Sequence, residues 1–320
     1  MVFWTDRERG HVLKDNNLFA LDEEDLVTPL ALSERQEWRL LRRLHIPDRF
    51  NDDGTGDIRS ALVVDVETTG LSTENDDVMQ LAMLAFDYEI ETGRILTVHK
   101  DEVFEGLREP AVPVSDEASL ITGITNEMVT GKSIDPDHVA AVVEGADLVI
   151  AHNAEFDRPM VERHWECFRE KPWGCSLKAV DWLHEGFSAG KLDYLGIQFG
   201  WFYDGHEAMA DCEACLALLA QMLPGSGKRV MSVVREDASK PEWLVRAIDS
   251  PFELKDKLKQ RKYQWRPKEL ANGKVWWTVT DDPEAEIDWL CREIYGRKVD
   301  LKAHPITATN RFTERIWDLR

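Results

Sequence analysis

The chain has 320 residues, a net charge of −21 and 43% hydrophobic residues, which suffices for one large or two to three small globular domains. No apolar run reaches the length of a membrane span, and Met1 to Ala20 lacks the apolar core of a signal peptide, so neither a membrane nor a secreted protein is expected. The five cysteines are odd in number and scattered, which argues against a disulfide framework. The composition therefore favours a cytoplasmic protein with free thiols.

The charge is distributed unevenly along the chain. Residues 228–320 hold 20 Lys and Arg against 16 Asp and Glu, whereas residues 1–227 hold 19 against 44. A break of this kind predicts two units with different roles. The acidic unit alone is a poor binder of a polyanion such as nucleic acid.

Residues 1–58 are expected to form an acidic N-terminal extension. Ser33 to Gln36 reads as a capping box, and it predicts a short helix through Leu44 that Pro47 ends. The extension could pack on the main domain or bind a partner, and the residues leave this choice open.

The stretch from Ala61 to Leu71 is the most informative part of the chain. Ala61 to Val64 is an apolar run typical of a buried strand, and Asp65 and Glu67 follow it. Residues two apart on a strand share a face, so both carboxylates project side by side. An edge strand with solvated acids is the alternative interpretation. Because two like charges in a buried setting need a neutralising cation, we predict a platform for metal ions.

Further elements are expected along the acidic unit after this strand. They are two antiparallel strands (78–88 and 95–104), helices over 115–121 and 135–144, a strand over 147–153, a helix over 155–169, a strand and helix within 175–184, and a helix over 207–223. Strands that alternate with helices after a hairpin predict an α/β fold whose mixed sheet is covered on both faces. We therefore expect one domain over residues 59–223.

A linker at residues 224–229 begins with Pro-Gly-Ser-Gly and is expected to end this domain. Residues 230–320 are then expected to form a small α/β accessory module. Its predicted elements are strands over 243–248 and 275–280, helices over 250–263 and 282–295, and one last strand.

Two more carboxylates and one histidine join Asp65 and Glu67 as candidate site residues. Asp157 lies in the first turn of the helix that follows the strand ending at His152-Asn153, and the helix dipole favours a carboxylate there. Asp211 lies on the last helix of the domain. His206 precedes it by five residues, so the two would not share a helix face, and we expect His206 in a loop over the site. Several convergent carboxylates are what a site for two metal ions requires.

These segments resemble the DEDDh family of DnaQ-like 3′→5′ exonucleases, in the ribonuclease H-like superfamily. The resemblance rests on V-V-D-V-E-T-T-G-L from Val63, A-H-N-A-E-F-D from Ala151 and H-E-A-M-A-D from His206, and it covers about residues 60–223. The C-terminal part of the chain is similar, more weakly, to a small module that follows some exonuclease-X-like domains.

The family resemblance implies a role for each matched residue. It implies that two Mg²⁺ or Mn²⁺ ions bind to Asp65, Glu67, Asp157 and Asp211. His206 would be the general base, and a histidine that titrates near neutrality can accept the proton of an attacking water. Substrate-binding residues implied in the same way are Thr68, Thr69 and Leu71 in the pocket of the terminal nucleotide, with His152 and Phe156 as supports.

A basic stretch in the accessory module is a candidate nucleic-acid contact. Its members Lys255, Lys259, Lys262 and Arg266 surround two aromatic residues, Tyr263 and Trp265, which could stack on bases. A solvated helix face is the alternative interpretation.

The sequence thus predicts a metal-dependent 3′→5′ exonuclease that releases nucleoside 5′-monophosphates. Single-stranded DNA is the favoured substrate, and a DNA polymerase or repair protein is a candidate partner. Trimming of RNA is an alternative, because nothing in these motifs reads a 2′-hydroxyl. A catalytically silent scaffold that binds nucleic acid or a polymerase is the second alternative, and the complete set of four acids and His206 argues against it.

Overall fold

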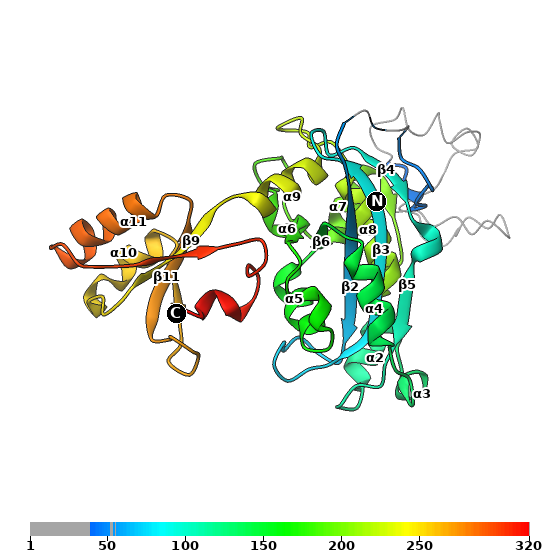
Figure 1. The fold of residues 1–320 in the computed structure, drawn as a ribbon, viewed down its shortest axis with the longest axis horizontal. Coiled ribbons are helices and arrows are strands. Elements are labelled where there is room, and N and C mark those ends of the chain that lie inside the picture. Colours follow the sequence, from blue (N-terminus) through cyan, green and yellow to red (C-terminus); the bar gives the residue numbers. More distant parts are fainter. Residues whose placement is uncertain (1–38, 52–53, 55, 320) are drawn as a thin grey trace, which may run out of the picture.

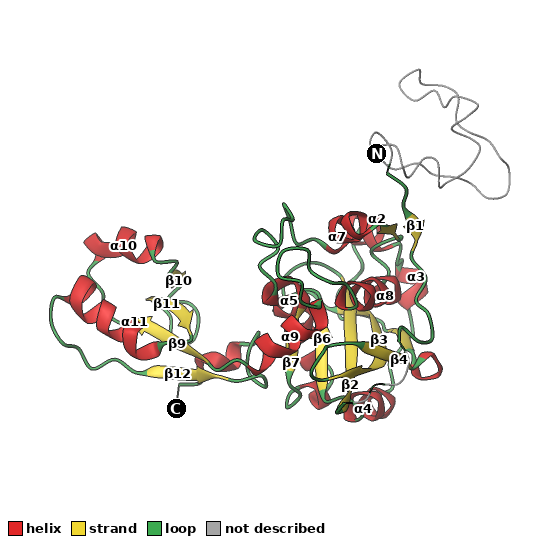
Figure 2. Cartoon of the chain, turned by 90° about the horizontal axis from the view of Figure 1, so that it is seen from above, coloured by secondary structure: helices red, strands yellow, loops and turns green. Residues whose placement is uncertain are grey.

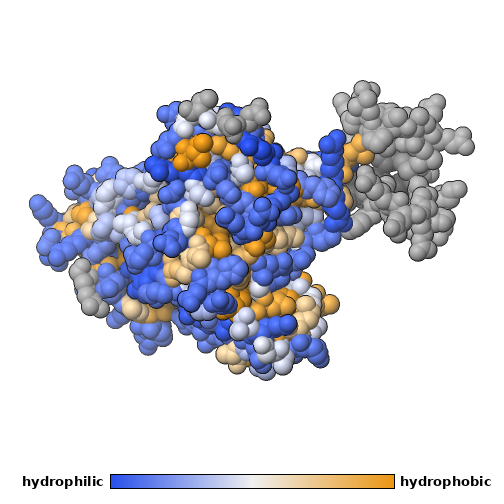
Figure 3. Space-filling view, turned by 45° about the vertical axis from the view of Figure 1, so that its right-hand side comes forward, coloured by the Kyte–Doolittle hydropathy of each residue, from blue (hydrophilic) through white to orange (hydrophobic). Residues whose placement is uncertain are grey.

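The computed structural model describes residues 39–51, 54 and 56–319, and it contains two units, each built on its own sheet (Figure 1). Within these residues, no helix is both long and apolar enough to cross a membrane. The five cysteines are unpaired. Hydrophilic residues cover most of the face shown in Figure 3, and hydrophobic residues form smaller patches between them.

The first unit contains a six-stranded mixed sheet. Its strands are β2 (Ile58–Thr68), β3 (Val78–Glu89), β4 (Ile95–Val98), β5 (Phe104–Leu107), β6 (Leu148–Ala151) and β7 (Trp173–Cys175). The order across the sheet is β4-β3-β2-β6-β7, with β5 paired to β3. Strand β2 lies in the middle, antiparallel to β3 and parallel to β6. The predicted strand over residues 95–104 is thus two short strands, β4 and β5.

Side chains on the two faces of β2 belong to two separate hydrophobic cores. Ala61 and Val63 belong to one core, and Leu62, Val64 and Val66 belong to the other. This alternation follows from the two-residue period of a strand. Because both faces are buried, the strand reads as a continuous apolar run, as expected for the centre of a covered sheet.

Helices cover both faces of this sheet (Figure 2). They are α2 (Asp116–Thr122), α3 (Asn126–Val129), α4 (Pro136–Glu144), α5 (Ala154–Glu162), α6 (Ser176–Ala179), α7 (Leu192–Phe199), α8 (Ala208–Leu219) and α9 (Val230–Ser239), with 3₁₀ turns η2 (Lys100–Glu102) and η3 (Glu166–Phe168). Helices α7, α8 and α9 contribute to the core that contains Val63. Helices α4 and α5 contribute to the core that contains Val64. The expected mixed α/β sheet covered on both faces is confirmed.

The second unit is a four-stranded antiparallel sheet with order β10-β11-β9-β12. Its elements are β9 (Glu242–Ala247), η4 (Phe252–Leu254), α10 (Lys255–Gln260), β10 (Gln264–Arg266), β11 (Val275–Thr280), α11 (Pro283–Leu290), the π-helical turn η5 (Cys291–Tyr295), β12 (Ala303–Ile306) and η6 (Glu314–Trp317). Asp282 caps α11, and Pro283 is its first residue.

The boundary between the units differs from the sequence-based expectation. Residues 224–229 are a turn rather than a linker between domains. An antiparallel β-bridge joins Met222 to Arg229, and the backbone N–H of Leu223 donates a hydrogen bond to the carbonyl of Lys228. The chain then continues into α9, whose Val230, Met231 and Val234 are buried in the core of the first unit. The first unit therefore extends through α9, and the second sheet begins at β9.

The N-terminal region also differs from the expectation. The first part of the helix predicted from Ser33, through Trp38, lies outside the described residues. Its end, near Leu44, is not helical, because Arg42–Arg43 form strand β1, which pairs in parallel with β8 (Trp201–Phe202). Ile46 is buried in the core of the first unit, so this part of the extension packs on the main domain.

Candidate active site

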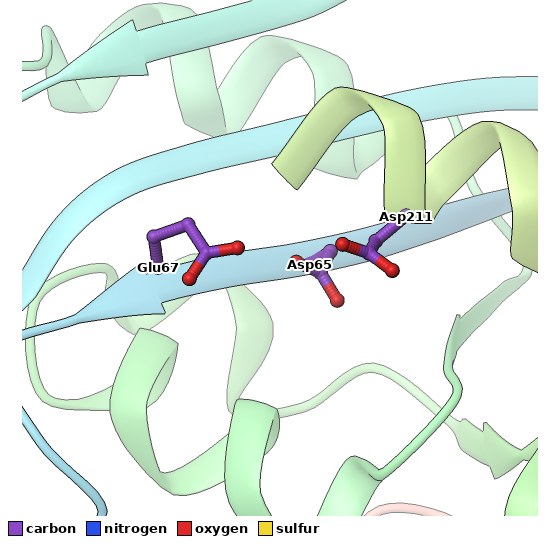
Figure 4. Close-up of side chains that lie close together, drawn as sticks. All are labelled: Asp65, Glu67 and Asp211. Atoms are coloured by element: carbon purple, nitrogen blue, oxygen red, sulfur yellow. The ribbon is translucent and has the colours of Figure 1, made fainter. Parts of the chain in front are cut away.

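Three carboxylates come together where β2 approaches the start of α8. Asp65 and Glu67 project from the same face of β2, and Asp211 projects toward them from the first turn of α8 (Figure 4). The three side chains each offer an oxygen atom, and these atoms all lie within 4.8 Å of one another. The predicted side-by-side arrangement of Asp65 and Glu67 is therefore what the fold contains.

Two buried side chains fix α8 against the sheet at this point. Gln80 on β3 lies opposite Glu67, and its side-chain oxygen accepts a hydrogen bond from the backbone N–H of Ala208, the first residue of α8. Cys212 packs between the two strands, with its sulfur near the carbonyl oxygens of Val63 and Ala82. The helix start is thereby held over the acidic face of β2, and the sequence patterns did not indicate this role for Gln80.

Asp157 approaches the same cluster from the other side of the sheet. It lies on α5, is only 4% exposed, and its carboxylate accepts a hydrogen bond from the backbone N–H of Val66. Its charge acts on Asp65, Glu67 and Asp211. The structure thus brings together all four predicted carboxylates, three of them in direct proximity.

Burial and mutual repulsion disfavour the charged forms of these acids. Burial, reinforced by Asp211, raises the pKa of Glu67 to about 7. Burial also raises the pKa of Asp157 to about 8, with smaller contributions from Glu67 and Asp211. For Asp65, burial and the three neighbouring carboxylates raise the pKa well above its usual range. An oxygen-rich site whose acids repel one another is suited to divalent cations such as Mg²⁺ and Mn²⁺.

His206 lies in the loop before α8, as predicted, and its side chain is exposed. Its backbone has a positive φ of 68°, and its N–H donates to Asp211 at 2.8 Å. The other oxygen of Asp211 accepts a hydrogen bond from the hydroxyl of Tyr203 at 2.6 Å. Tyr203 is thus a site residue that the sequence analysis missed, because a lone tyrosine in a loop gives no spacing signal.

The loop after β2 contains the predicted contacts of the terminal nucleotide. Thr68 and Thr69 are buried, and their hydroxyls are used within the turn, on Gly70 and on Asp76 and Asp77. Leu71, in contrast, is 88% exposed. Such exposure leaves Leu71 free for contact with a ligand.

Asp77 holds this loop in place and was not predicted. Its buried carboxylate accepts hydrogen bonds from Arg108 at 2.7 Å and from the N–H of Ala111 at 2.7 Å, and His164 lies 2.6 Å away. The hydrogen bond from Ala111 and the charge of Arg108 outweigh burial, and the pKa of Asp77 is lowered. Arg163, just after the last residue of α5, donates a hydrogen bond to the carbonyl of Thr73. This contact links the same loop to the end of the helix.

His152 and Phe156 occupy supporting positions. The ring nitrogens of His152 lie 2.8 Å from the Ser176 hydroxyl and 2.8 Å from the Gly190 carbonyl. Burial lowers the pKa of His152 to about 4, so the ring is neutral and is held in place by these partners. Phe156, on α5, is half-buried and packs against the core that this helix covers. Both positions fit a supporting role more closely than direct contact with substrate.

The basic stretch of the second unit is only partly available for binding. Tyr263 is buried and donates to Glu286, and Arg266 is buried and paired with Glu314, so the expectation that these two contact nucleic acid is wrong. Tyr263 belongs to the core that contains Leu258, and Arg266 lies over the ring of Trp317 in the other core of the second unit. Lys259, Lys262 and Trp265 are exposed, and Lys255 lies over the ring of Phe252.

An acidic cluster on the central strand of a mixed, helix-covered sheet defines the class of divalent-metal nucleases with a ribonuclease H-like fold. Residues 62–219 match the family model RNase_T, described as Exonuclease. This part of the chain belongs to that family of DnaQ-like 3′→5′ exonucleases, which depend on divalent metal ions.

The chain is also similar to individual proteins, among them DNA polymerases and one exonuclease of known structure. The chain is 31% identical over 182 residues to a DNA polymerase III PolC-type from Lacticaseibacillus paracasei, covering 54% of this chain and 12% of the polymerase. It is 26% identical over 169 residues to DNA polymerase III subunit epsilon from Aquifex aeolicus, covering 51% and 79%. A solved structure of exonuclease X in complex with 5′ overhanging duplex DNA is 24% identical, with a TM-score of 0.41 and coverage of 56% and 98%. The chain spans only a small part of the PolC-type polymerases it matches.

Proposed function

We propose that this chain is a 3′→5′ exonuclease that removes nucleoside 5′-monophosphates from single-stranded DNA. The observation that carries the proposal is the convergence of Asp65, Glu67 and Asp211, with Asp157 beside them, within a domain of the exonuclease family. The two DNA polymerase III relatives support DNA as the substrate and a DNA polymerase as a partner. A cytoplasmic location, expected from the sequence, stays a prediction.

Four clustered carboxylates, for which the described residues supply no Lys or Arg ion pair, fit a pair of divalent cations. Asp65, Glu67, Asp157 and Asp211 would hold them, and Tyr203 orients Asp211 through its hydrogen bond. When bound, two Mg²⁺ or Mn²⁺ ions supply positive charge to the attacking and leaving oxygens of a phosphodiester. The supporting evidence is the chemistry of the donor set, which consists of oxygen ligands held close together.

His206 would act as the general base. It lies beside Asp211 on an exposed loop, and from there it would accept the proton of a water molecule that attacks the phosphorus atom. A histidine is suited to accept that proton near neutral pH. Exposed Leu71 would contact the terminal base, and Thr68 and Thr69 would shape its pocket through the turn that their hydroxyls stabilise.

The exposed part of the basic stretch would hold the strand upstream of the cut end. Lys259 and Lys262 would contact phosphates, and Trp265, which is 48% exposed beside Trp276, would stack on a base. Lys255, whose ammonium group lies over the ring of Phe252, would add a positive charge to this surface. This surface belongs to the basic part of the chain, and it offsets the strong negative charge of the first unit.

The test uses labelled single-stranded DNA and RNA of equal length, incubated with the full chain in Mn²⁺ or Mg²⁺ and in chelator. We expect DNA to be shortened from its 3′ end to nucleoside 5′-monophosphates in metal only. Asp65→Ala should abolish the reaction while the protein stays folded. Preferential shortening of RNA would replace the substrate assignment, and metal-independent cleavage or an active Asp65→Ala variant would overturn the proposal.

A further inference from the structure

The C-terminal segment, residues 307–315, leaves the second sheet and returns to the first unit. In Figure 1 it is the red loop that lies between the second sheet and helix α5. The backbone N–H of Trp173, on edge strand β7, donates to the carbonyl of Ala308 at 2.9 Å. Phe312 packs against the core formed by α4, α5 and their face of the sheet. The last residues of the chain are therefore part of the wall of the first unit.

Arg158 on α5 donates hydrogen bonds to this segment. Its side chain is fully buried, and its Nε donates to Glu162 at 2.7 Å. The four remaining N–H groups reach backbone carbonyls, namely those of Ala308 at 3.2 Å, Arg311 at 2.9 Å, Thr309 at 2.5 Å and Arg169 at 3.1 Å. All five donors of a guanidinium are thus used, and three of their acceptors belong to the C-terminal segment.

The same segment, together with Trp317 just after it, is also fixed to the second sheet. Glu314 pairs with buried Arg266 of β10, and the carbonyl of Trp317 accepts from Asn272 at 2.8 Å. Arg315, one residue from Glu314, reaches the other way and pairs with Glu162 of α5. The segment therefore joins the second sheet to the helix that carries Asp157.

We propose that Arg158 is a positioning residue for Asp157, and that the C-terminal segment completes the metal site by fixing α5. The proposal rests on the role of Asp157 as a metal ligand. Helix α5 has nine residues, and Asp157 and Arg158 are neighbours on it, with one facing the acids and the other facing the C-terminal segment. Without its acceptors, a buried guanidinium must move toward water, and a helix this short moves with it. Asp157 would then leave its place beside Asp65.

The test compares three full-length variants by Mn²⁺ binding, measured by calorimetry and by the rise in melting temperature on Mn²⁺ addition. Arg158→Met removes the donors on α5, and Arg315→Met removes the ion pair between the C-terminal segment and Glu162 of α5. Arg311→Met is the matched control, because Arg311 is also a buried arginine of this segment but its side chain bonds Asp237 and Glu242 instead of α5. We expect all three to melt earlier, and only the first two to bind Mn²⁺ about 10-fold more weakly, the lower end of what loss of a ligand-orienting partner costs.

A second readout separates positioning from stability. At saturating Mn²⁺ the maximal cleavage rate of Arg315→Met should approach that of the unmodified chain, because the chemical groups are intact. Asp157→Ala, included in the series, should weaken Mn²⁺ binding on its own. If it does not, the ligand assignment is wrong. If it does, and Arg315→Met or a folded Arg158→Met binds Mn²⁺ like Arg311→Met, the positioning role is wrong.

Discussion

At the scale of single residues, the carboxylates of the site repel one another, and hydrogen bonds orient some of them. Four acids share one buried region, and the hydrogen bonds from Tyr203, His206 and the backbone of Val66 hold two of them in place. The sequence predicted the acids, because each follows a recognisable strand end or helix start. It did not predict Tyr203 or Asp77, because their roles depend on contacts between loops that no spacing rule describes.

The raised pKa values predict how the stability of the metal-free protein depends on pH. Folded Glu67 and Asp157 keep their protons up to about pH 7 and 8, whereas in the unfolded chain they lose them near pH 4. The unfolding free energy should therefore fall as the pH rises from about 4 to 8, on the order of a few kcal/mol. Urea unfolding in chelator at pH 5 and pH 8 measures this. Asp157→Asn should reduce the fall, and an unchanged slope in that variant would contradict the prediction.

Removal of the Tyr203 hydroxyl should weaken the metal site without damage to the fold. In Tyr203→Phe, Asp211 loses one of the donors that orient it, and we expect about 10-fold weaker Mn²⁺ binding. Titration of the cleavage rate with Mn²⁺ is the measurement. Tyr194→Phe is the control, since Tyr194 packs against the same core but bonds Ser188. Equal Mn²⁺ requirements in the two variants would remove Tyr203 from the site.

Replacement of His206 by alanine should lower the maximal rate by roughly 10²–10⁴-fold, the usual contribution of a general base. Mn²⁺ binding should persist, because the side chain of His206 is not a proposed ligand. The pH–rate profile is the decisive measurement. A profile like that of the unmodified chain would exclude His206 as the base.

At the scale of elements, the fit between β7 and α9 shows why the domain boundary was misplaced. Gly174 on β7 lies under Val234 of α9, and a Cβ on Gly174 would come within 2.7 Å of a methyl carbon of Val234. The sequence marks a turn at Pro224 and Gly225, and a turn inside a domain looks the same as a linker between domains. The packing of α9 on β7, together with the bonds across the turn, distinguishes the two.

This contact makes a direct test of the boundary. Gly174→Ala should destabilise the first unit by about 1–3 kcal/mol, because the added methyl group forces α9 away from the sheet. Val234→Ala in the same chain should recover part of that loss, and Val234→Ala alone provides the reference. Additive effects of the two substitutions in urea unfolding would show that α9 does not pack on β7.

At the scale of the whole molecule, opposite charges are placed on different units. The central strand of the first unit followed from the apolar run at Ala61 to Val64, and the fold class followed from strands that alternate with helices after a hairpin. The attachment of the C-terminal segment did not, because backbone carbonyls accept the hydrogen bonds of Arg158 whatever their side chains are.

Charge reversal on the second unit should change the salt dependence of binding. In Lys259→Glu with Lys262→Glu, the slope of log K against log salt for a long single strand should become shallower by about 1.4, since each phosphate contact contributes about 0.7. Lys298→Glu with Lys302→Glu is the charge-matched control on the same unit. Oligonucleotides too short to reach the second unit should bind equally to all three chains. If both double variants gave the same slope, the basic stretch would be a solvated face that does not contact nucleic acid.

The bonds of Arg311 have a consequence for how the second sheet could be replaced. Its guanidinium reaches Asp237 at the end of α9 and Glu242 at the start of β9, so the chain leaves the first unit and comes back to it at nearly the same place. The second sheet is therefore an insertion whose two ends lie close together, and two chain segments, instead of one, connect it to the first unit. A short loop that joins Ser239 to Thr307 should close the gap, leave the C-terminal segment on α5, and yield a nuclease onto which a foreign binding domain can be grafted.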